Sequence, residues 1–259
     1  MRSPDSHKGE NGKVAIIGGS AHQHGAPLFC ALAAEASGAD LIFVCVPACH
    51  TEVTKAQSLN FQVHPFADNE LTKKDIPMIL ELLATMDCAV LGPGLARSQD
   101  VLDVITQIIT SSPCPLVLDA SALQPKTPEL AMNKGCILTP HAGELERMRI
   151  DPTKIGQTAR DRHITILVKG VIDRIADEEG NVTEVKGGNA GLSVGGTGDA
   201  LAGLTAGLFA QHLSAAEACR IASKVIKNAG DELMKTYGFA YGTRRVIEAI
   251  AVQLKKIRA

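Results

Sequence analysis

The 259-residue sequence contains no tryptophan, and aromatic residues make up only 3% of it. It also lacks an apolar run of about 18 residues, the length that a membrane-spanning helix needs. Basic residues show no excess, because 26 Lys and Arg stand against 28 Asp and Glu, for a formal net charge of -2. A general nucleic-acid-binding protein usually has a basic excess. These absences argue against nucleic acid or a membrane as partners.

The seven cysteines form no CxxC pair and no Cys/His cluster with the spacing of metal ligands. Several lie in apolar segments such as "LIFVCVPAC" (41–49) and "DCAVLG" (87–92). This pattern indicates buried free thiols in a reducing compartment, so we expect a cytoplasmic protein. The first 12 residues are polar and lack the apolar segment of a secretory signal. We therefore expect a flexible leader over 1–12, without fold content, and a single domain over 13–259.

Short β-branched apolar runs alternate with longer helical patterns along the chain. Strands are predicted at 13–20, 41–47, 88–94, 115–121, 135–140 and 164–170. Helices are predicted at 26–40, 98–110, 142–149, 198–211, 214–236 and 243–257. Strands that are apolar throughout, with helices between them, indicate a parallel sheet covered on both faces. We expect a three-layer α/β/α sandwich with a mainly parallel central sheet, and an antiparallel hairpin over 173–186 at the sheet edge.

Polar and glycine-rich segments follow most of the predicted strands. They are "GGSAHQHGA" (18–26), "GPG" (92–94), "DAS" (119–121), "TPHAGE" (139–144) and "KG" (169–170), and "GGTGD" (195–199) precedes a long helix. Ligands of open α/β sheets gather beyond the carboxyl ends of the strands. Six such segments at one sheet edge favour a binding site over ordinary polar loops.

The "GGTGD" segment suggests an anion site with a carboxylate beside it. The amides of Gly195, Gly196, Thr197 and Gly198 stand at a helix N-terminus, an arrangement that binds phosphate. Asp199 would repel phosphate, so we interpret it as a general base that takes a proton from a hydroxyl attacking a phosphoryl group. The alternative is that Asp199 only caps the helix. A cap alone would not require three glycines.

At this point the residues resemble a known family. "GGTGDALAGLTAGLFAQ" (195–211), preceded by Asn189 and Gly191, resembles the signature of the ribokinase-like superfamily. Within it, the pattern resembles the ADP/ATP-dependent NAD(P)H-hydrate dehydratases. Further motifs follow in that family's order, namely "GGSAHQHGAP" (18–27), "LGPGL" (91–95), "LVLDASAL" (116–123) and "ILTPHAGELERM" (137–148). The resemblance covers roughly residues 13 to 235.

The resemblance implies a cofactor-repair lyase. Such an enzyme uses ATP or ADP, with Mg²⁺, to phosphorylate the ring hydroxyl of hydrated NADH or NADPH, and phosphate then leaves. Asp199 matches the catalytic base, and the amides of 195–198 match the anion hole. Ala26, Gly94, His141 and Asp199 match hydrate-binding positions. Lys169, Gly170 and Gly198 match nucleotide-binding positions. Glu144 and Asp119 are candidates to contact metal or its water, with helix capping and a plain turn as the alternatives. A homo-oligomer is also implied.

Three features depart from the family pattern. The aromatic residue expected before "GAP" is absent, and His22 or His24 is a candidate to replace it. Asp173 stands where the family's K-G-x-x-T motif has Thr, so it either faces away from the nucleotide or belongs to a rearranged nucleotide loop. The stretch between "TPHAGE" and "VKG" leaves little room for a covering helix.

Two other functions stay open at this stage. A ribokinase-like small-molecule kinase would release its phosphorylated product, and it would need the same glycine loop. A nucleotide-binding protein without turnover would keep the fold, although the intact Asp199 argues against it.

Overall fold

The computed structural model describes residues 5–258, and within them nine strands form one sheet in the order β3-β2-β1-β4-β5-β6-β7-β8-β9. Seven strands run parallel to one another: β1 (Lys13–Ile17), β2 (Leu41–Val46), β3 (Phe61–Pro65), β4 (Cys88–Leu91), β5 (Leu116–Leu118), β6 (Ile137–Leu138) and β7 (Thr165–Val168). The predicted hairpin is confirmed as β8 (Asp173–Ala176) and β9 (Val182–Val185), which are antiparallel at one edge.

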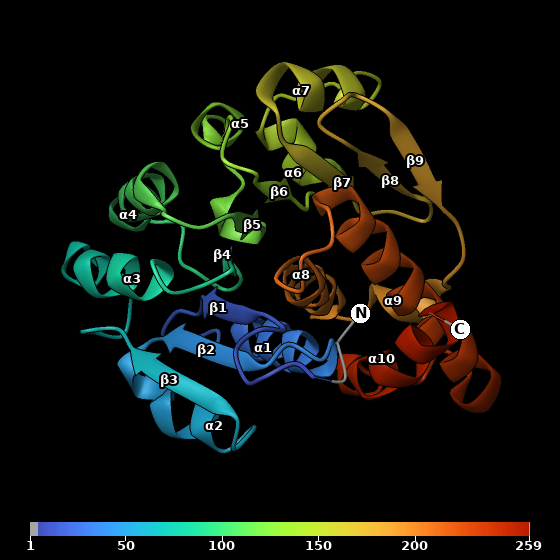
Figure 1. The fold of residues 1–259 in the computed structure, drawn as a ribbon, viewed down its shortest axis with the longest axis horizontal. Coiled ribbons are helices and arrows are strands. Elements are labelled where there is room, and N and C mark those ends of the chain that lie inside the picture. The colour runs from blue at the N-terminus through green and yellow to red at the C-terminus, as the bar shows by residue number, and fades with distance from the viewer. Residues whose placement is uncertain (1–4, 259) are drawn as a thin grey trace.

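Helices cover both faces of this sheet, as Figure 1 shows. One face carries α1 (Gly25–Ala36), α8 (Thr197–Phe209), α9 (Ala215–Tyr237) and α10 (Thr243–Arg258). The other carries α3 (Ile76–Leu83), α4 (Gln99–Ser111), α5 (Thr127–Leu130), α6 (Ala142–Arg147) and α7 (Ile155–Arg162). A short helix, α2 (Thr51–Lys55), lies beside the edge strand β3. The three-layer α/β/α prediction is confirmed.

Alternate residues of the central strands enter the two cores. Val14 and Ile16 of β1 pack with α1 and α8, whereas Ala15 and Ile17 pack with the α3–α7 side. Because side chains alternate across a strand, a strand buried on both faces must be apolar at every position. This requirement explains the continuous apolar runs that predicted the strands.

Small residues bring α1 and α8 into close parallel contact. A methyl group at Gly203 would overlap the backbone of Cys30, and one at Gly207 would overlap the side chain of Ser37. The buried Cys30 thiol also donates a hydrogen bond to the carbonyl oxygen of Asp199, at 2.9 Å. This packing fixes the position of the first turn of α8.

Several elements differ from the sequence-based expectation. Strand β3 and helices α2, α3 and α5 were not predicted, and α7 occupies the stretch that was expected to leave little room for a helix. Within the predicted leader, the N–H groups of Gly9 and Asn11 donate to Oδ2 of Asp40, at 2.8 and 3.1 Å, so these residues contact the rest of the fold. Residues 1–4 lie outside the described residues, and the domain division after residue 12 stays a prediction. No helix in the described part of the chain is sufficiently long and apolar to span a bilayer.

Candidate active site

The segments after the strands meet at the carboxyl edge of the sheet, as predicted. The N–H of Gly19 donates to the carbonyl of Pro93 at 2.8 Å, which joins the first and fourth strand ends. The N–H of Lys169 donates to the carbonyl of Pro140 at 2.8 Å, which joins the sixth and seventh. The Lys169 side chain then reaches Asp119 at the end of the fifth. The predicted site residues therefore share one edge.

The N-terminus of α8 depends on Gly196, which caps the helix with a φ of 94°. Only glycine adopts this region without strain, and a methyl group there would also overlap the ring of Phe29. Gly195 differs, because a methyl group on it would meet no protein atom within 4 Å. Both glycines belong to the predicted anion hole. Gly195 has open space beside it for a ligand, whereas Gly196 is also required for the turn that begins α8.

Thr197 departs from the simple anion-hole interpretation. Its N–H donates to the carbonyl of Val194 at 3.4 Å, and its hydroxyl donates to the same oxygen at 3.1 Å. The side chain is buried and lies 3.3 Å from the hydroxyl of Thr243. Thr197 thus fixes the loop before the helix, and it also lines the cavity described below.

Asp199 is not the helix cap. It stands at the third position of α8, after the Gly196 cap, and within residues 5–258 its carboxylate accepts no hydrogen bond. The capping alternative is therefore wrong. The pKa of Asp199 is raised to about 7, mainly because the carboxyl is buried. The negative charge of Asp119 raises this pKa further, the positive charge of Lys169 lowers it, and Glu144 makes a smaller contribution that raises it. A carboxylate with a pKa near neutrality is well suited to accept a proton.

A partly buried lysine, Lys169, lies beside the carboxylates near Asp199 and offsets part of their charge. The Nζ atom of Lys169 lies 2.7 Å from Oδ1 of Asp119 and 3.8 Å from Oε2 of Glu144. Burial lowers the pKa of Lys169, but the carboxylates of Asp119 and Glu144 raise it to a net value above the ordinary one. A methyl group on Gly198 would lie 3.4 Å from this Nζ. The ammonium is therefore adjacent to the first turn of α8.

His141 and Glu144 form a capping box at the start of α6. Nδ1 of His141 accepts the N–H of Gly143 at 3.0 Å, and Oε2 of Glu144 accepts the N–H of His141 at 2.9 Å. The helix-capping role considered for Glu144 is thus present in the structure. The His141 side chain remains 57% exposed, and its Nε2 lies 3.5 Å from Oε1 of Glu144.

A cavity of about 670 Å³ lies between Lys169, the first turn of α8 and helix α9. Its lining includes four residues predicted to bind substrate or nucleotide: His141, Lys169, Gly170 and Gly198. The rest comes largely from residues 187–194 and from the buried face of α9. This volume is in the range of small-molecule sites. The predicted nucleotide position therefore coincides with a formed cavity.

Asp173 was expected either to face away from the nucleotide or to belong to a rearranged nucleotide loop, and its carboxylate is held by neighbouring protein groups. It is only 5% exposed, and Oδ1 accepts the N–H of Gly170 at 2.9 Å. Oδ2 accepts the hydroxyl proton of Ser223 at 2.6 Å, and Lys227 lies 3.5 Å from Oδ1. Asp173 is therefore an internal support of the "KG" loop.

The remaining predicted substrate-binding residues, Ala26 and Gly94, lie at and beside the start of α1. A methyl group on Gly94 would lie 3.2 Å from Cβ of Ala26, so these two positions adjoin. His24 directly precedes α1, and its ring centroid is 5.3 Å from that of His50. His24 therefore presents an aromatic pair beside Ala26, and His22 makes no comparable ring contact within the described residues.

Sequence reasoning missed the residues of α9 and Tyr241 that hold the cavity wall. Oδ2 of Asp231 accepts the N–H of Gly188 at 3.0 Å, and the Tyr241 hydroxyl donates to Oδ1 of Asn189 at 2.6 Å. Lys227 lies on the buried stripe of α9 between Ile226 and Ala229. That position on an otherwise apolar stripe was the one available signal, because a lysine there requires a partner.

The comparisons agree with this geometry. The family model for NAD(P)H-hydrate dehydratase matches residues 14–252. The ADP-dependent (S)-NAD(P)H-hydrate dehydratase of Cenarchaeum symbiosum is 35% identical over 92% of this chain and 86% of its own length. The ATP-dependent (S)-NAD(P)H-hydrate dehydratase of Aedes aegypti is also 35% identical, over 94% of this chain and 78% of its own.

A solved structure has the same fold. The ADP/ATP-dependent NAD(P)H-hydrate dehydratase of Bacillus subtilis, co-crystallised with ATP and Mg²⁺, superposes with a TM-score of 0.83 at 22% identity, covering 99% of this chain and 93% of that one. The match of the family model along nearly the whole length, with the identities above, shows that this chain belongs to the NAD(P)H-hydrate dehydratase family, on a ribokinase-like fold.

Proposed function

We propose that the protein dehydrates hydrated NADH or NADPH in a reaction that consumes ATP or ADP, and so returns the damaged cofactor to its reduced form. The observation that carries the proposal is the position of Asp199. Its carboxylate has no protein hydrogen bond within the described residues. Asp199 directly follows Gly198, which lines the nucleotide-sized cavity, and its backbone carbonyl accepts a hydrogen bond from Cys30 of α1, the helix that carries Ala26. Two substrates bound in the cavity and beside Ala26 would meet at the base.

The proposed reaction has two steps. Asp199 takes the proton of the ring hydroxyl, and the oxygen attacks the terminal phosphoryl group of the nucleotide, so that the bond to the rest of the nucleotide breaks. The ring nitrogen lone pair then expels phosphate, and loss of a proton from the adjacent carbon restores the double bond. Hydroxide is a poor leaving group and phosphate a good one, which is why the nucleotide is consumed.

The surrounding residues supply position and charge. The N–H groups at the start of α8, near Gly195 and Gly198, would stabilise the negative charge that develops on the transferring phosphoryl group. Lys169, adjacent to Gly198, adds a positive charge on the nucleotide side. The pKa of about 7 leaves a large fraction of Asp199 ionised at neutral pH, as a base requires.

Mg²⁺ fits this site only together with the nucleotide. The described residues contain no group of three or more His, Cys, Asp or Glu side chains that could hold a metal ion. Mg²⁺ commonly binds through one or two carboxylates, water and substrate phosphates. Glu144 and Asp119 are the buried carboxylates that would hold it or its water, and the ion would neutralise phosphate charge.

One assay separates the candidate functions. Purified protein is mixed with hydrated NADH, Mg²⁺ and either ATP or ADP, and the absorbance of the reduced nicotinamide is followed. Recovery of that absorbance supports repair and identifies the phosphoryl donor. A stable phosphorylated product would instead indicate a kinase, and neither outcome would leave a binding protein without turnover. Assembly into a homo-oligomer and a cytoplasmic location are further proposals from the sequence, outside this assay.

A further inference from the structure

Helix α9 carries a buried lysine that contacts the "KG" loop directly. The side chain of Lys227 is 7% exposed. Its Nζ donates to the carbonyl oxygens of Gly170 and Val171, at 3.1 and 3.0 Å, and lies 3.5 Å from Oδ1 of Asp173. A buried charge is costly unless it is paired and hydrogen-bonded. Here each interaction of the ammonium is with the loop of residues 170–173.

The same loop is held by a second group on α9. The carboxylate of Asp173 accepts the N–H of Gly170 and the hydroxyl proton of Ser223, at 2.9 and 2.6 Å. Ser223 and Lys227 are four residues apart and so lie on one side of the helix. Asp231, four residues further along, binds the N–H of Gly188 in the second segment that lines the cavity. One stripe of α9 therefore contacts both segments of the cavity wall.

The contacts of Lys227 also orient two peptide groups. The described chain has no cis peptide bond, so each N–H points opposite to the carbonyl of the preceding residue. The carbonyls of Gly170 and Val171 face Lys227, which turns the N–H groups of Val171 and Ile172 away from α9. Neither N–H has an acceptor in residues 5–258, and Val171 is 91% exposed. Two adjacent, outward-facing amides of this kind bind anions.

We propose that Lys227, paired with Asp173, is a positioning residue that holds the 170–173 loop so that the amides of Val171 and Ile172 face the phosphates of the bound nucleotide. This inference rests on the proposed function, because it assigns the cavity to ATP or ADP. It also explains the acidic residue at position 173. A carboxylate at this position would otherwise repel phosphate. Here the ammonium of Lys227 neutralises its charge, and the hydroxyl of Ser223 donates a hydrogen bond to it.

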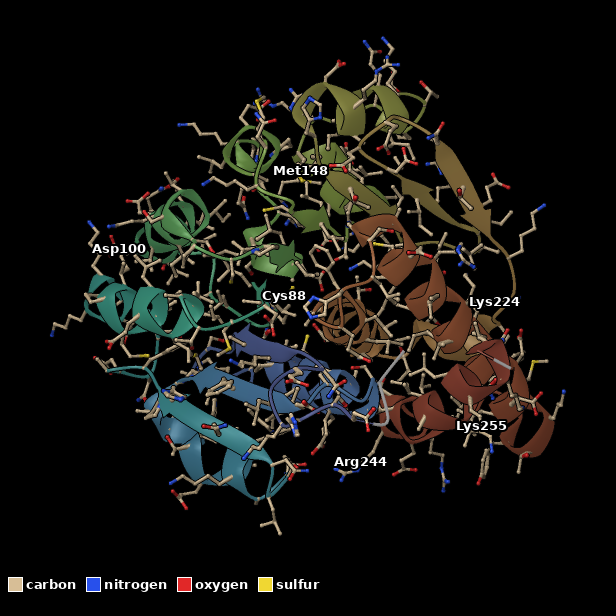
Figure 2. The ribbon with its side chains drawn as sticks, in the orientation of Figure 1. Cys88, Asp100, Met148, Lys224, Arg244 and Lys255 are labelled. Atoms are coloured by element: carbon tan, nitrogen blue, oxygen red, sulfur yellow. The ribbon has the colours of Figure 1, made fainter. Side chains whose placement is uncertain are left out.

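The first test compares two lysines of the same helix. Lys227→Met removes the buried ammonium with little change in side-chain volume, and Lys224→Met removes an exposed one, labelled in Figure 2, with the same loss of charge. We expect Lys227→Met to weaken ATP or ADP binding, measured by calorimetry, by about tenfold or more, on the order of one hydrogen bond to a charged group. Lys224→Met should bind as the wild type does. The KM for hydrated NADH should not change in either variant, whereas a merely destabilised fold would affect both substrates.

The second test removes both charges together. Lys227→Met alone leaves Asp173 buried without its cation, so the protein is also made as Asp173→Thr and as Asp173→Thr/Lys227→Met. We expect the double variant to unfold at a higher temperature than either single variant. Its affinity for nucleotide should remain about tenfold lower than that of the wild type. Nucleotide affinity equal to that of the wild type in a folded double variant would overturn the proposal. Wild-type protein that binds nucleotide but leaves hydrated NADH unchanged would contradict the proposed function only.

Discussion

Lys169 and Asp119 form a partly buried ion pair, with 2.7 Å between Nζ and Oδ1, at the ends of two strands that flank β6. Because Asp119 neutralises part of the lysine charge, Lys169 only partly opposes the effect of burial on Asp199. The pKa of Asp199 consequently stays near 7. Both members of this ion pair, which lies on the nucleotide side of the site, therefore influence the pKa of the proposed base Asp199.

The pH dependence of turnover follows from this arrangement. The base must be ionised, so kcat/KM should fall as the pH drops below about 7, tenfold per pH unit. Asp119→Asn removes a carboxylate that raises the pKa of Asp199, so the acidic limb should move to lower pH. Nucleotide binding measured over the same range separates protonation of the nucleotide from that of Asp199. The assignment of this limb to Asp199 would be contradicted if kcat/KM fell only near pH 4. It would also be contradicted if Asp119→Asn left the midpoint of the acidic limb unchanged.

Asp199→Asn keeps the shape of the side chain but cannot accept the proton. Loss of a general base typically lowers the rate by about 10²–10⁴-fold, and we expect kcat to fall by that order. The start of α8 should be unaffected, because Gly196 and not Asp199 occupies the cap. Calorimetry should therefore find nucleotide affinity close to that of the wild type. Turnover within a few-fold of the wild type in the folded variant would remove Asp199 from the mechanism.

Most of the sheet was predictable because strands buried on both faces must be apolar throughout. Strand β3, "FQVHP", escaped because it is an edge strand with exposed Gln62 and Pro65. Helix α7, "IGQTARDR", escaped because few of its residues are apolar. In both cases only one side of the element faces the core, so the pattern is weak.

The site was predictable where it depends on local sequence and not where it depends on distant contacts. The glycines before Asp199 predict the turn, since a φ of 94° at Gly196 is a local requirement. By contrast, Lys227 is 56 and 57 residues from the carbonyls that it binds. Nothing near either segment predicts that pairing. The burial of Asp173 follows from the same long-range contact.

Two adjacent glycines of the loop should respond differently to alanine. Gly196→Ala forces a side chain into a φ of 94° and against the Phe29 ring, so the melting temperature should fall by several degrees. Gly195→Ala meets no protein atom within 4 Å and should keep the wild-type melting temperature. If phosphate approaches Gly195, the added methyl group should still weaken nucleotide binding several-fold. Full affinity in Gly195→Ala would place the phosphates away from this residue.

The two histidines before α1 provide a matched pair for the other substrate. The ring of His24 contacts that of His50 in a tilted arrangement, with centroids 5.3 Å apart, beside the predicted hydrate-binding residue Ala26. We expect His24→Ala to raise the KM for hydrated NADH several-fold, since a contact between aromatic rings contributes about 0.5–1.5 kcal/mol. Nucleotide affinity should not change. The exposed His22 serves as the control, and an equal effect of His22→Ala would argue against a specific role for the His24–His50 pair.

The raised pKa of Asp199 also predicts a pH-dependent gain in stability on its removal. In the unfolded chain this carboxyl has an ordinary pKa of 3.8, and in the folded protein the value is about 7. The folded state therefore holds the proton more tightly, and the stability that this proton contributes is lost as the pH rises from about 4 to about 7. Asp199→Asn is neutral at all pH values and avoids that loss. Its melting temperature should exceed that of the wild type by a few degrees at about pH 8, and by less at about pH 5. Thermal unfolding of both proteins, without nucleotide, measures the difference. A constant or reversed difference across this range would mean that Asp199 ionises in the folded protein as an ordinary carboxylate does.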